Sequence, residues 1–146
     1  MAKTIALWGI AFLLLLQTVQ IEISTPSAID PKREIDAPKE IINMLKVSCY
    51  DCHSYQTKMP WYANVAPFSW SVRSHIKKGR NWFNFQEWNS YDEEKKQKIY
   101  KGIAKTISYS MPMPMYLSFH DEAKLTQQER NRIKKWAQNN IKDENE

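Results

Sequence analysis

The stretch KVSCYDCHSYQ, residues 46–56, contains both cysteines of the chain, Cys49 and Cys52, followed directly by His53. Two cysteines separated by two residues occur in redox disulfides, in half of a zinc site and in the covalent attachment of haem. On one helical turn both sulfurs lie on the same side and can reach the two vinyl groups of one porphyrin. His53 can then bind the iron through Nε2. The spacing C-x-x-C-H therefore favours c-type haem attachment.

For each of the other uses of two cysteines, the sequence lacks a feature that the use requires or leaves a residue unexplained. A thioredoxin-like disulfide requires a βαβ setting, and no strand pattern surrounds the motif. Zinc requires two more ligands, whereas the chain has no third cysteine, and His75 and His120 lack the paired spacing of zinc sites. A structural disulfide leaves His53 without a role. We therefore predict haem c as the cofactor, with His53 as the proximal iron ligand.

The first 21 residues, MAKTIALWGIAFLLLLQTVQI, place one lysine before an apolar run from Ile5 to Leu16. This pattern is typical of export signals. The 17 residues from Ile5 to Ile21 are at the lower limit for spanning a bilayer, and no small-x-small cleavage site follows them. We expect an uncleaved membrane anchor in preference to a removed signal peptide, and a domain on the periplasmic, extracytoplasmic face of the inner membrane.

Residues 22–36 are predicted to be a linker. Prolines, serines and mixed charges break both the helical and the strand period in STPSAIDPKREIDAPKE, which begins at Ser24. As an extended chain this segment could hold a domain roughly tens of ångströms from the membrane. Residues 37–146 then form one haem-binding domain with a single core.

From Asp36 onward the periodicity is helical, and no alternating run is long enough to form a strand. The predicted fold is all-α: a cytochrome c-like domain of about four helices around one covalently attached haem. The first expected helix is capped by Asp36 and buries Ile41, Ile42 and Leu45. The second runs from about Pro67 to Lys78 and is ended by Gly79. The third and fourth follow capping boxes at Ser90/Glu93 and Thr126/Glu129.

The net charge of +5 comes from lysines that are interleaved with acidic residues. No basic helix or cluster reaches the density of a nucleic-acid footprint, so we exclude DNA and RNA as partners. A mild positive field is better suited to steering the domain toward an acidic protein or a membrane surface.

A second candidate for the iron is the segment SYSMPMPMYLSFH, residues 108–120. Met111, Met113 and Met115 alternate with two prolines, which should keep the segment extended between two helices. A thioether is a soft ligand that favours ferrous iron and raises the reduction potential. A rigid loop after a helix is a suitable place for such a ligand.

Four motifs follow one another along the sequence: C-x-x-C-H-S from Cys49, P-W-Y from Pro60, W…H…G-R…N-F-x-x-W from Trp70, and M-P…Y…H-x-x-A-x-L-T from Met111. Together and in this order they resemble the small haem-binding domain family of bacterial, often membrane-anchored, mono-haem c-type cytochromes. The resemblance covers about residues 38–137 and implies Met111 as the distal ligand. Because the M-P unit is repeated here, Met113 competes, and Met115, His75 and an open site remain alternatives. The matching positions are Cys49, Cys52, His53, Pro60, Trp61, Tyr62, Trp70, His75, Gly79, Arg80, Asn84, Phe85, Trp88, Met111, Pro112, Tyr116, His120, Ala123, Leu125 and Thr126.

Several polar side chains could contact the haem propionates. An arginine fork matches a carboxylate, and an indole N–H can donate to one. His75 shares an apolar helix face and is expected to be a hydrogen-bonded core residue, and His120 is expected to be solvated. The candidate haem contacts are Arg73, Arg80, Trp61 and Trp70, with Trp82 and Trp88 as further indoles.

The chain lacks an acid-base pair and a substrate motif, so we expect an electron carrier and not an enzyme. The predicted function is transfer of single electrons by an extracytoplasmic mono-haem cytochrome domain, with redox proteins as partners. The alternative is a haem-based sensor or a peroxidase-like protein whose sixth ligand can exchange.

Overall fold

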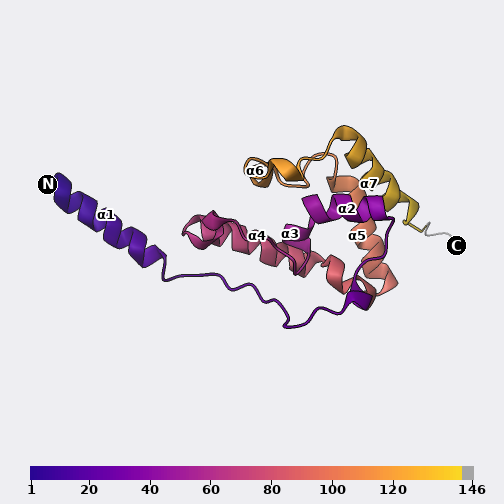
Figure 1. The fold of residues 1–146 in the computed structure, drawn as a ribbon, viewed down its shortest axis with the longest axis horizontal. Helices are drawn as coiled ribbons and strands as arrows, with labels where there is room; N and C mark the ends of the chain where they lie inside the picture. Colours follow the sequence, from indigo (N-terminus) through magenta and orange to yellow (C-terminus); the bar gives the residue numbers. More distant parts are fainter. Residues whose placement is uncertain (143–146) are drawn as a thin grey trace.

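A computed structural model describes residues 1–142 of the chain (Figure 1). Across these residues the structure contains seven α-helices, short 3-10 turns and no strand, which confirms the all-α prediction. The helices are α1 (Ala2–Leu16), α2 (Lys39–Ser48), α3 (Tyr50–His53), α4 (Phe68–Trp82), α5 (Glu93–Thr106), α6 (Pro114–Leu117) and α7 (Gln127–Asn139). Of those after residue 37, α2, α4, α5 and α7 have ten or more residues and correspond to the four expected helices.

The helix starts were predicted with mixed success. The Thr126/Glu129 capping box is present at the start of α7. Helix α2 instead begins after Pro38, and Asp36 lies too far upstream to cap it. Helix α5 is capped by Asp92, whose carboxylate accepts from the Lys95 N–H at 2.7 Å. The predicted Ser90/Glu93 capping box is therefore wrong, because Asp92, which is adjacent to the first helical residue, caps the helix.

The structure corrects two further predictions, one for Gly79 and one for the methionine-rich segment. Gly79 does not end α4, which continues to Trp82. The methionine-rich segment, predicted to be extended, instead forms turns and bends at residues 107–112, and Pro114 begins the short helix α6 directly after Met113. A proline at the first helical position loses no hydrogen bond, since that N–H has no intrahelical acceptor. Met115 consequently lies on a helix and not on an extended strand.

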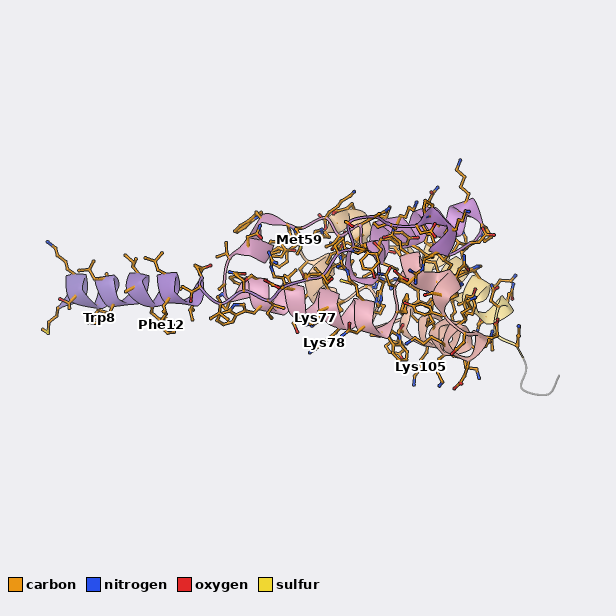
Figure 2. The ribbon with its side chains drawn as sticks, turned by 90° about the horizontal axis from the view of Figure 1, so that it is seen from below. Trp8, Phe12, Met59, Lys77, Lys78 and Lys105 are labelled. Carbon is orange, nitrogen blue, oxygen red and sulfur yellow. The ribbon has the colours of Figure 1, made fainter. Side chains whose placement is uncertain are left out.

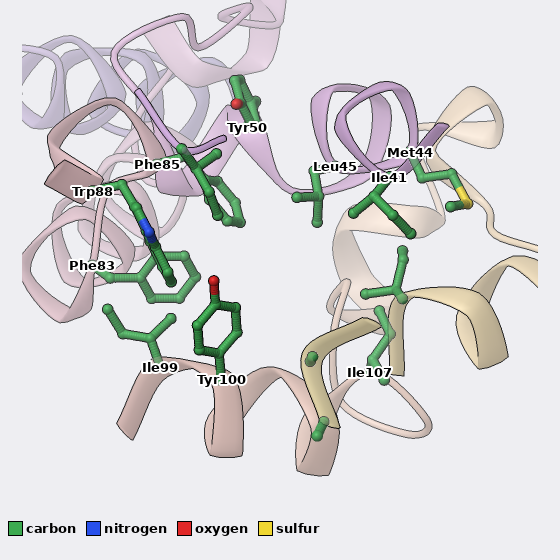
Figure 3. Packing of buried hydrophobic residues seen from close by; sticks show 14 residues of the cluster. Ile41, Met44, Leu45, Tyr50, Phe83, Phe85, Trp88, Ile99, Tyr100 and Ile107 are labelled. Carbon is green, nitrogen blue, oxygen red and sulfur yellow. The ribbon is translucent and has the colours of Figure 1, made fainter. Parts of the chain in front are cut away.

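The core lies where α2, α5 and α7 meet the segment that follows α4 (Figure 3). Phe85, Leu45, Ile99 and Ile133 are almost completely buried. Ile35 also belongs to this core, and its N–H donates to the Phe85 carbonyl at 2.8 Å. The end of the predicted linker is thus part of the packed domain, because an isoleucine within it completes the apolar cluster.

Helix α1 projects away from the domain (Figure 1), and its apolar side chains are exposed on all sides. A helix of 15 residues is about 22 Å long at about 1.5 Å per residue. Within residues 1–142, we find no helix with the length and apolar character needed to cross a bilayer.

Candidate functional site

The motif at Cys49 to His53 occupies a single turn of helix. Cys49 ends α2 and precedes α3, and its carbonyl accepts from the N–H groups of Cys52 at 3.2 Å and His53 at 3.0 Å. The backbone at Cys49 departs from helical geometry, so α3 starts a new direction after α2. This turn brings both thiols and the imidazole to the wall of one cavity.

This cavity has a volume of about 400 Å³ and predominantly apolar walls. Helices α2 and α3 form one side of it with Leu45, Ser48 and the C-x-x-C-H turn. Helix α4, the aromatic residues that follow it, α5 and the methionine-rich segment form the rest. The lining residues outside α2 and α3 include His75, Lys78, Gly79, Trp82, Phe83, Phe85, Gly102, Ile103, Thr106, Met111, Met113 and Tyr116.

The close contact between α3 and α4 depends on Gly79. A Cβ atom at this position would lie 2.6 Å from the carbonyl oxygen of Cys52. Real Cβ atoms do not approach a backbone oxygen so closely, and neither partner is a flexible side chain. Glycine is therefore required here for helix packing, although its backbone is ordinary helix.

His53 is oriented by the residues just after α4. Its Nδ1 lies 3.2 Å from the Phe83 carbonyl, and its ring stacks on the Phe83 ring with centroids 4.1 Å apart. A carbonyl can only accept, so Nδ1 carries the proton and Nε2 keeps its lone pair. Burial lowers the pKa of His53 and keeps the imidazole neutral, although the carbonyls of Phe83 and Gly79 oppose this shift. Neutral imidazole with a bound Nδ1–H is the form that ligates metals.

Both cysteines are free thiols in the structure. Desolvation by the surrounding protein raises the pKa of Cys49 to about 11, against a hydrogen bond from Ser48 and the charge of Arg130. Desolvation raises the pKa of Cys52 to about 11 as well, with a smaller contribution from Asp51. The thiols are therefore neutral at physiological pH. Within residues 1–142 we find no group of three or more His, Cys, Asp or Glu residues arranged to hold a metal ion.

Met111 and Met113 both line the cavity, whereas Met115 lies on α6 with 57% of its surface exposed. The backbone of Met111 is held at two points: its N–H donates to Thr106 at 3.1 Å, and its carbonyl accepts from Arg130 of α7 at 2.9 Å. The same guanidinium donates to the Ile107 carbonyl at 2.6 Å. Arg130 thus fastens both ends of the turn that leads into the methionine-rich segment.

A long-range hydrogen bond joins the methionine-rich segment to the C-x-x-C-H turn. The Tyr116 hydroxyl donates to Oδ2 of Asp51 at 2.7 Å, and both residues line the cavity. Asp51 is itself fixed, since its Oδ1 accepts from the Lys58 N–H at 2.9 Å. Burial, followed by the bond to Asp51, raises the pKa of Tyr116, so its hydroxyl remains a donor at physiological pH.

We expect Tyr116→Phe to lower the free energy of unfolding by about 2 kcal/mol, because a hydrogen bond to a charged acceptor is worth about 1.5–3 kcal/mol. Urea denaturation of the haem-loaded protein measures this change. Tyr109→Phe is the control, since the Tyr109 side chain is exposed and should contribute little. Equal stabilities of the two variants would show that the Tyr116–Asp51 bond does not support the domain.

The other two histidines have defined partners. His75 lines the cavity and directs Nδ1 to the Ser71 carbonyl at 2.8 Å, as expected for a hydrogen-bonded helix residue. His120 is not solvated as predicted. Its Nε2 lies 2.9 Å from the Tyr62 hydroxyl and its Nδ1 2.9 Å from Glu122, and its ring stacks on Tyr116. Of its two aromatic neighbours, Tyr116 is four positions earlier in the sequence and Tyr62 comes from a distant part of it.

The structure does not bring Arg73, Arg80, Trp61 or Trp70 to the cavity wall. Trp61 is exposed, and the other three side chains donate to backbone carbonyls of residues 19–24. Lys78 and Trp82 are the cation and the indole that line the cavity from α4. Trp82 was among the candidate indoles, whereas Lys78 was missed, and helical spacing could have indicated it because positions 75, 78 and 82 share one helix face.

A family model described as a haem-binding domain matches residues 11–139 of the chain. No curated protein and no solved structure matched the sequence. The match to the family model includes the C-x-x-C-H turn, α4, α5 and the methionine-rich segment, which together form the cavity. Because the match covers most of the sequence, this chain belongs to the haem-binding domain family.

Proposed function

We propose that this protein is a c-type cytochrome domain that holds one haem through thioethers at Cys49 and Cys52 and carries single electrons outside the cytoplasm. Helix α1 would anchor it to the inner membrane. The observation that carries the proposal is one apolar cavity lined by two thiols, two thioethers and two imidazoles, of which His53 lies in the same turn as the thiols. We propose an electron carrier and not an enzyme.

The chemistry of these residues fits a haem. Neutral thiols at Cys49 and Cys52 can form thioether bonds with vinyl groups, and His53 has a free Nε2 for iron. The walls of the space between them are predominantly apolar, which suits a porphyrin ring. When bound, haem supplies a one-electron iron couple, and a methionine thioether would favour its ferrous form. Lys78 and the Trp82 N–H are the cavity-lining donors that we assign to the propionates.

Covalent attachment is tested by producing the full chain in cells competent in cytochrome maturation and staining the denatured protein for haem after electrophoresis. We expect the wild type to stain and a Cys49→Ala, Cys52→Ala double variant to lose the stain. A colourless wild-type band would overturn the proposal, because only covalently bound haem stays on a denatured chain.

The distal ligand is assigned by replacing each cavity-lining methionine. We expect Met111→Ala to abolish the thioether-to-iron charge-transfer band in the ferric spectrum, because the bond that produces it is lost. Met113→Ala is the matched control and should keep the band, since its neighbour still ligates. The reverse pattern would assign Met113 as the ligand.

The alternative function, a sensor or peroxidase-like protein, is favoured by one observation: Met111, Met113 and His75 all line the cavity, so more than one side chain could occupy the sixth position. Carbon monoxide and cyanide titrations separate the two functions. Slow and weak binding supports the electron carrier, whereas a high-spin ferric protein that binds cyanide readily supports an exchangeable ligand.

Redox proteins with an acidic face are the proposed partners. Lys77, Lys78 and Lys105 are exposed along one side of the domain (Figure 2), and Lys78 lines the cavity. Helix α4 contains no acidic residue. Positive charge beside the cavity would steer an acidic partner toward the haem, and its effect should decrease as ionic strength rises.

A further inference from the structure

We propose that the surface formed by Trp61, Val65, Phe68 and Phe119, here called the aromatic face, contacts the lipid bilayer and seats the domain on the membrane beside α1. This inference rests on the membrane anchor of the proposed function and adds a second point of contact to it. The occupant is the interfacial layer of a bilayer with anionic lipids.

These four side chains are unusually exposed for apolar residues. Trp61 is 79% exposed, Phe119 67%, Phe68 64% and Val65 42%. They belong to one region, since the Tyr62 ring lies 5.8 Å from that of Trp61 and 5.2 Å from that of Phe119. Val65 and Phe68 follow on the turn that leads into α4. Grouped exposed apolar side chains mark a surface that binds something, whereas isolated ones do not.

The end of α1 is joined directly to this face. The Gln17 side chain accepts from the Ala66 N–H at 2.9 Å and donates to the Ala66 carbonyl at 3.3 Å. Ala66 lies between Val65 and Phe68. The aromatic face is therefore held next to the end of α1 by a reciprocal pair of hydrogen bonds. A bilayer that surrounds α1 would lie beside this face.

The chain after α1 is also fastened along α4. The Trp70 N–H donates to the Val19 carbonyl at 2.6 Å, Arg73 donates to the Ile21 carbonyl at 3.3 Å, and Arg80 donates to the Ser24 carbonyl at 2.8 Å. These bonds turn residues 17–24, which are the end of the predicted anchor and the start of the predicted linker, into a strap bound to the domain. The domain is consequently held with the start of α4 toward α1 (Figure 1).

Lipid is the occupant that fits α1 and the charge of the region. Trp8 and Phe12 project from α1 (Figure 2), which has no polar face that could remain in water. Residues 52–86, which include Trp61, Val65 and Phe68, contain basic residues and no Asp or Glu. Asp121 and Glu122 follow Phe119, and they contact Lys124 and His120 respectively. Positive charge favours anionic headgroups, and exposed tryptophan is enriched at the membrane interface. An acidic protein would match the charge but not the continuity with α1.

The test uses the full haem-loaded chain in nanodiscs of phosphatidylcholine and phosphatidylglycerol, with a benzophenone maleimide attached to Phe68→Cys. After illumination, mass spectrometry is expected to show a phospholipid adduct. Val47→Cys is the matched control, since Val47 is 49% exposed on α2, away from the aromatic face, and should give no such adduct. A cross-linked dimer, or no lipid adduct at Phe68, would overturn the inference.

Two readouts separate this inference from the proposed function. Labelling of three thiols per chain would show that Cys49 and Cys52 are free and that covalent haem attachment has failed. Failure of the chain to enter nanodiscs would overturn the anchor and the aromatic face together. A chain that enters nanodiscs with haem attached, but gives equal results at positions 68 and 47, overturns the aromatic face alone.

Discussion

Gly79→Ala is expected to destabilise the domain by about 3 kcal/mol, at the upper end of the usual range for overpacking. The added Cβ would lie 2.6 Å from the carbonyl oxygen of Cys52, and backbone atoms on both sides prevent simple relaxation. Helix α4 would have to move away from α3 and carry the cavity wall with it. Thermal or urea denaturation of the haem-loaded protein measures the loss.

Gly102→Ala is the matched control for this substitution. Gly102 also lies within a helix, and a Cβ there would meet nothing closer than Trp82 at 3.9 Å. In a helix interior, alanine is favoured over glycine by roughly 0.5–1 kcal/mol, so this variant should lose much less stability than Gly79→Ala even though Gly102 also lines the cavity. If both variants were equally stable, α3 and α4 would not pack as closely as described.

His53→Ala should convert the haem from a low-spin to a high-spin form and give the largest spectroscopic change of any single substitution. In the proposed site the His53 imidazole would hold the iron, and the Phe83 carbonyl that orients it would lose its donor in the variant. The absorption spectra of the ferric and ferrous protein report the change. Added imidazole should restore part of the low-spin spectrum by entering the vacated space beside Phe83.

His75→Ala provides the comparison, because His75 lines the same cavity and has the same kind of bond from Nδ1 to a backbone carbonyl. We expect its spectrum to remain low-spin. If the His53→Ala protein stayed low-spin and the His75→Ala protein became high-spin, His75 would be the proximal ligand. The C-x-x-C-H histidine would then be rejected in that role.

Several features that local sequence determines were predicted correctly, although the Asp36 cap and the Ser90/Glu93 capping box, which are also local, were wrong. The Thr126/Glu129 capping box depends only on residues three positions apart, and the all-α class follows from periodicity within each segment. The motif at Cys49, Cys52 and His53 likewise lies within a single turn, so its shared side could be inferred without the fold.

The features that depend on distant contacts were missed. Gly79 was predicted to end a helix, but its role comes from Cys52, 27 positions earlier in the chain. Arg80 donates to the carbonyls of Ser24 and Ser54, which no local pattern can indicate. His120 was expected in water because acidic residues follow it, whereas Tyr62 and Tyr116 enclose it. Cys52, Ser24, Ser54 and Tyr62 become neighbours of these residues only after the chain folds, whereas Tyr116 is local to His120.

The strap at residues 17–24 determines how far the domain can travel. A flexible coil of this length would let a carrier swing through a wide volume and meet partners at many heights. Hydrogen bonds from Trp70, Arg73 and Arg80 to its backbone remove that freedom. On a membrane, a carrier held in this way would search for partners by lateral diffusion within a thin layer, and its encounter rate would depend on the surface density of both proteins.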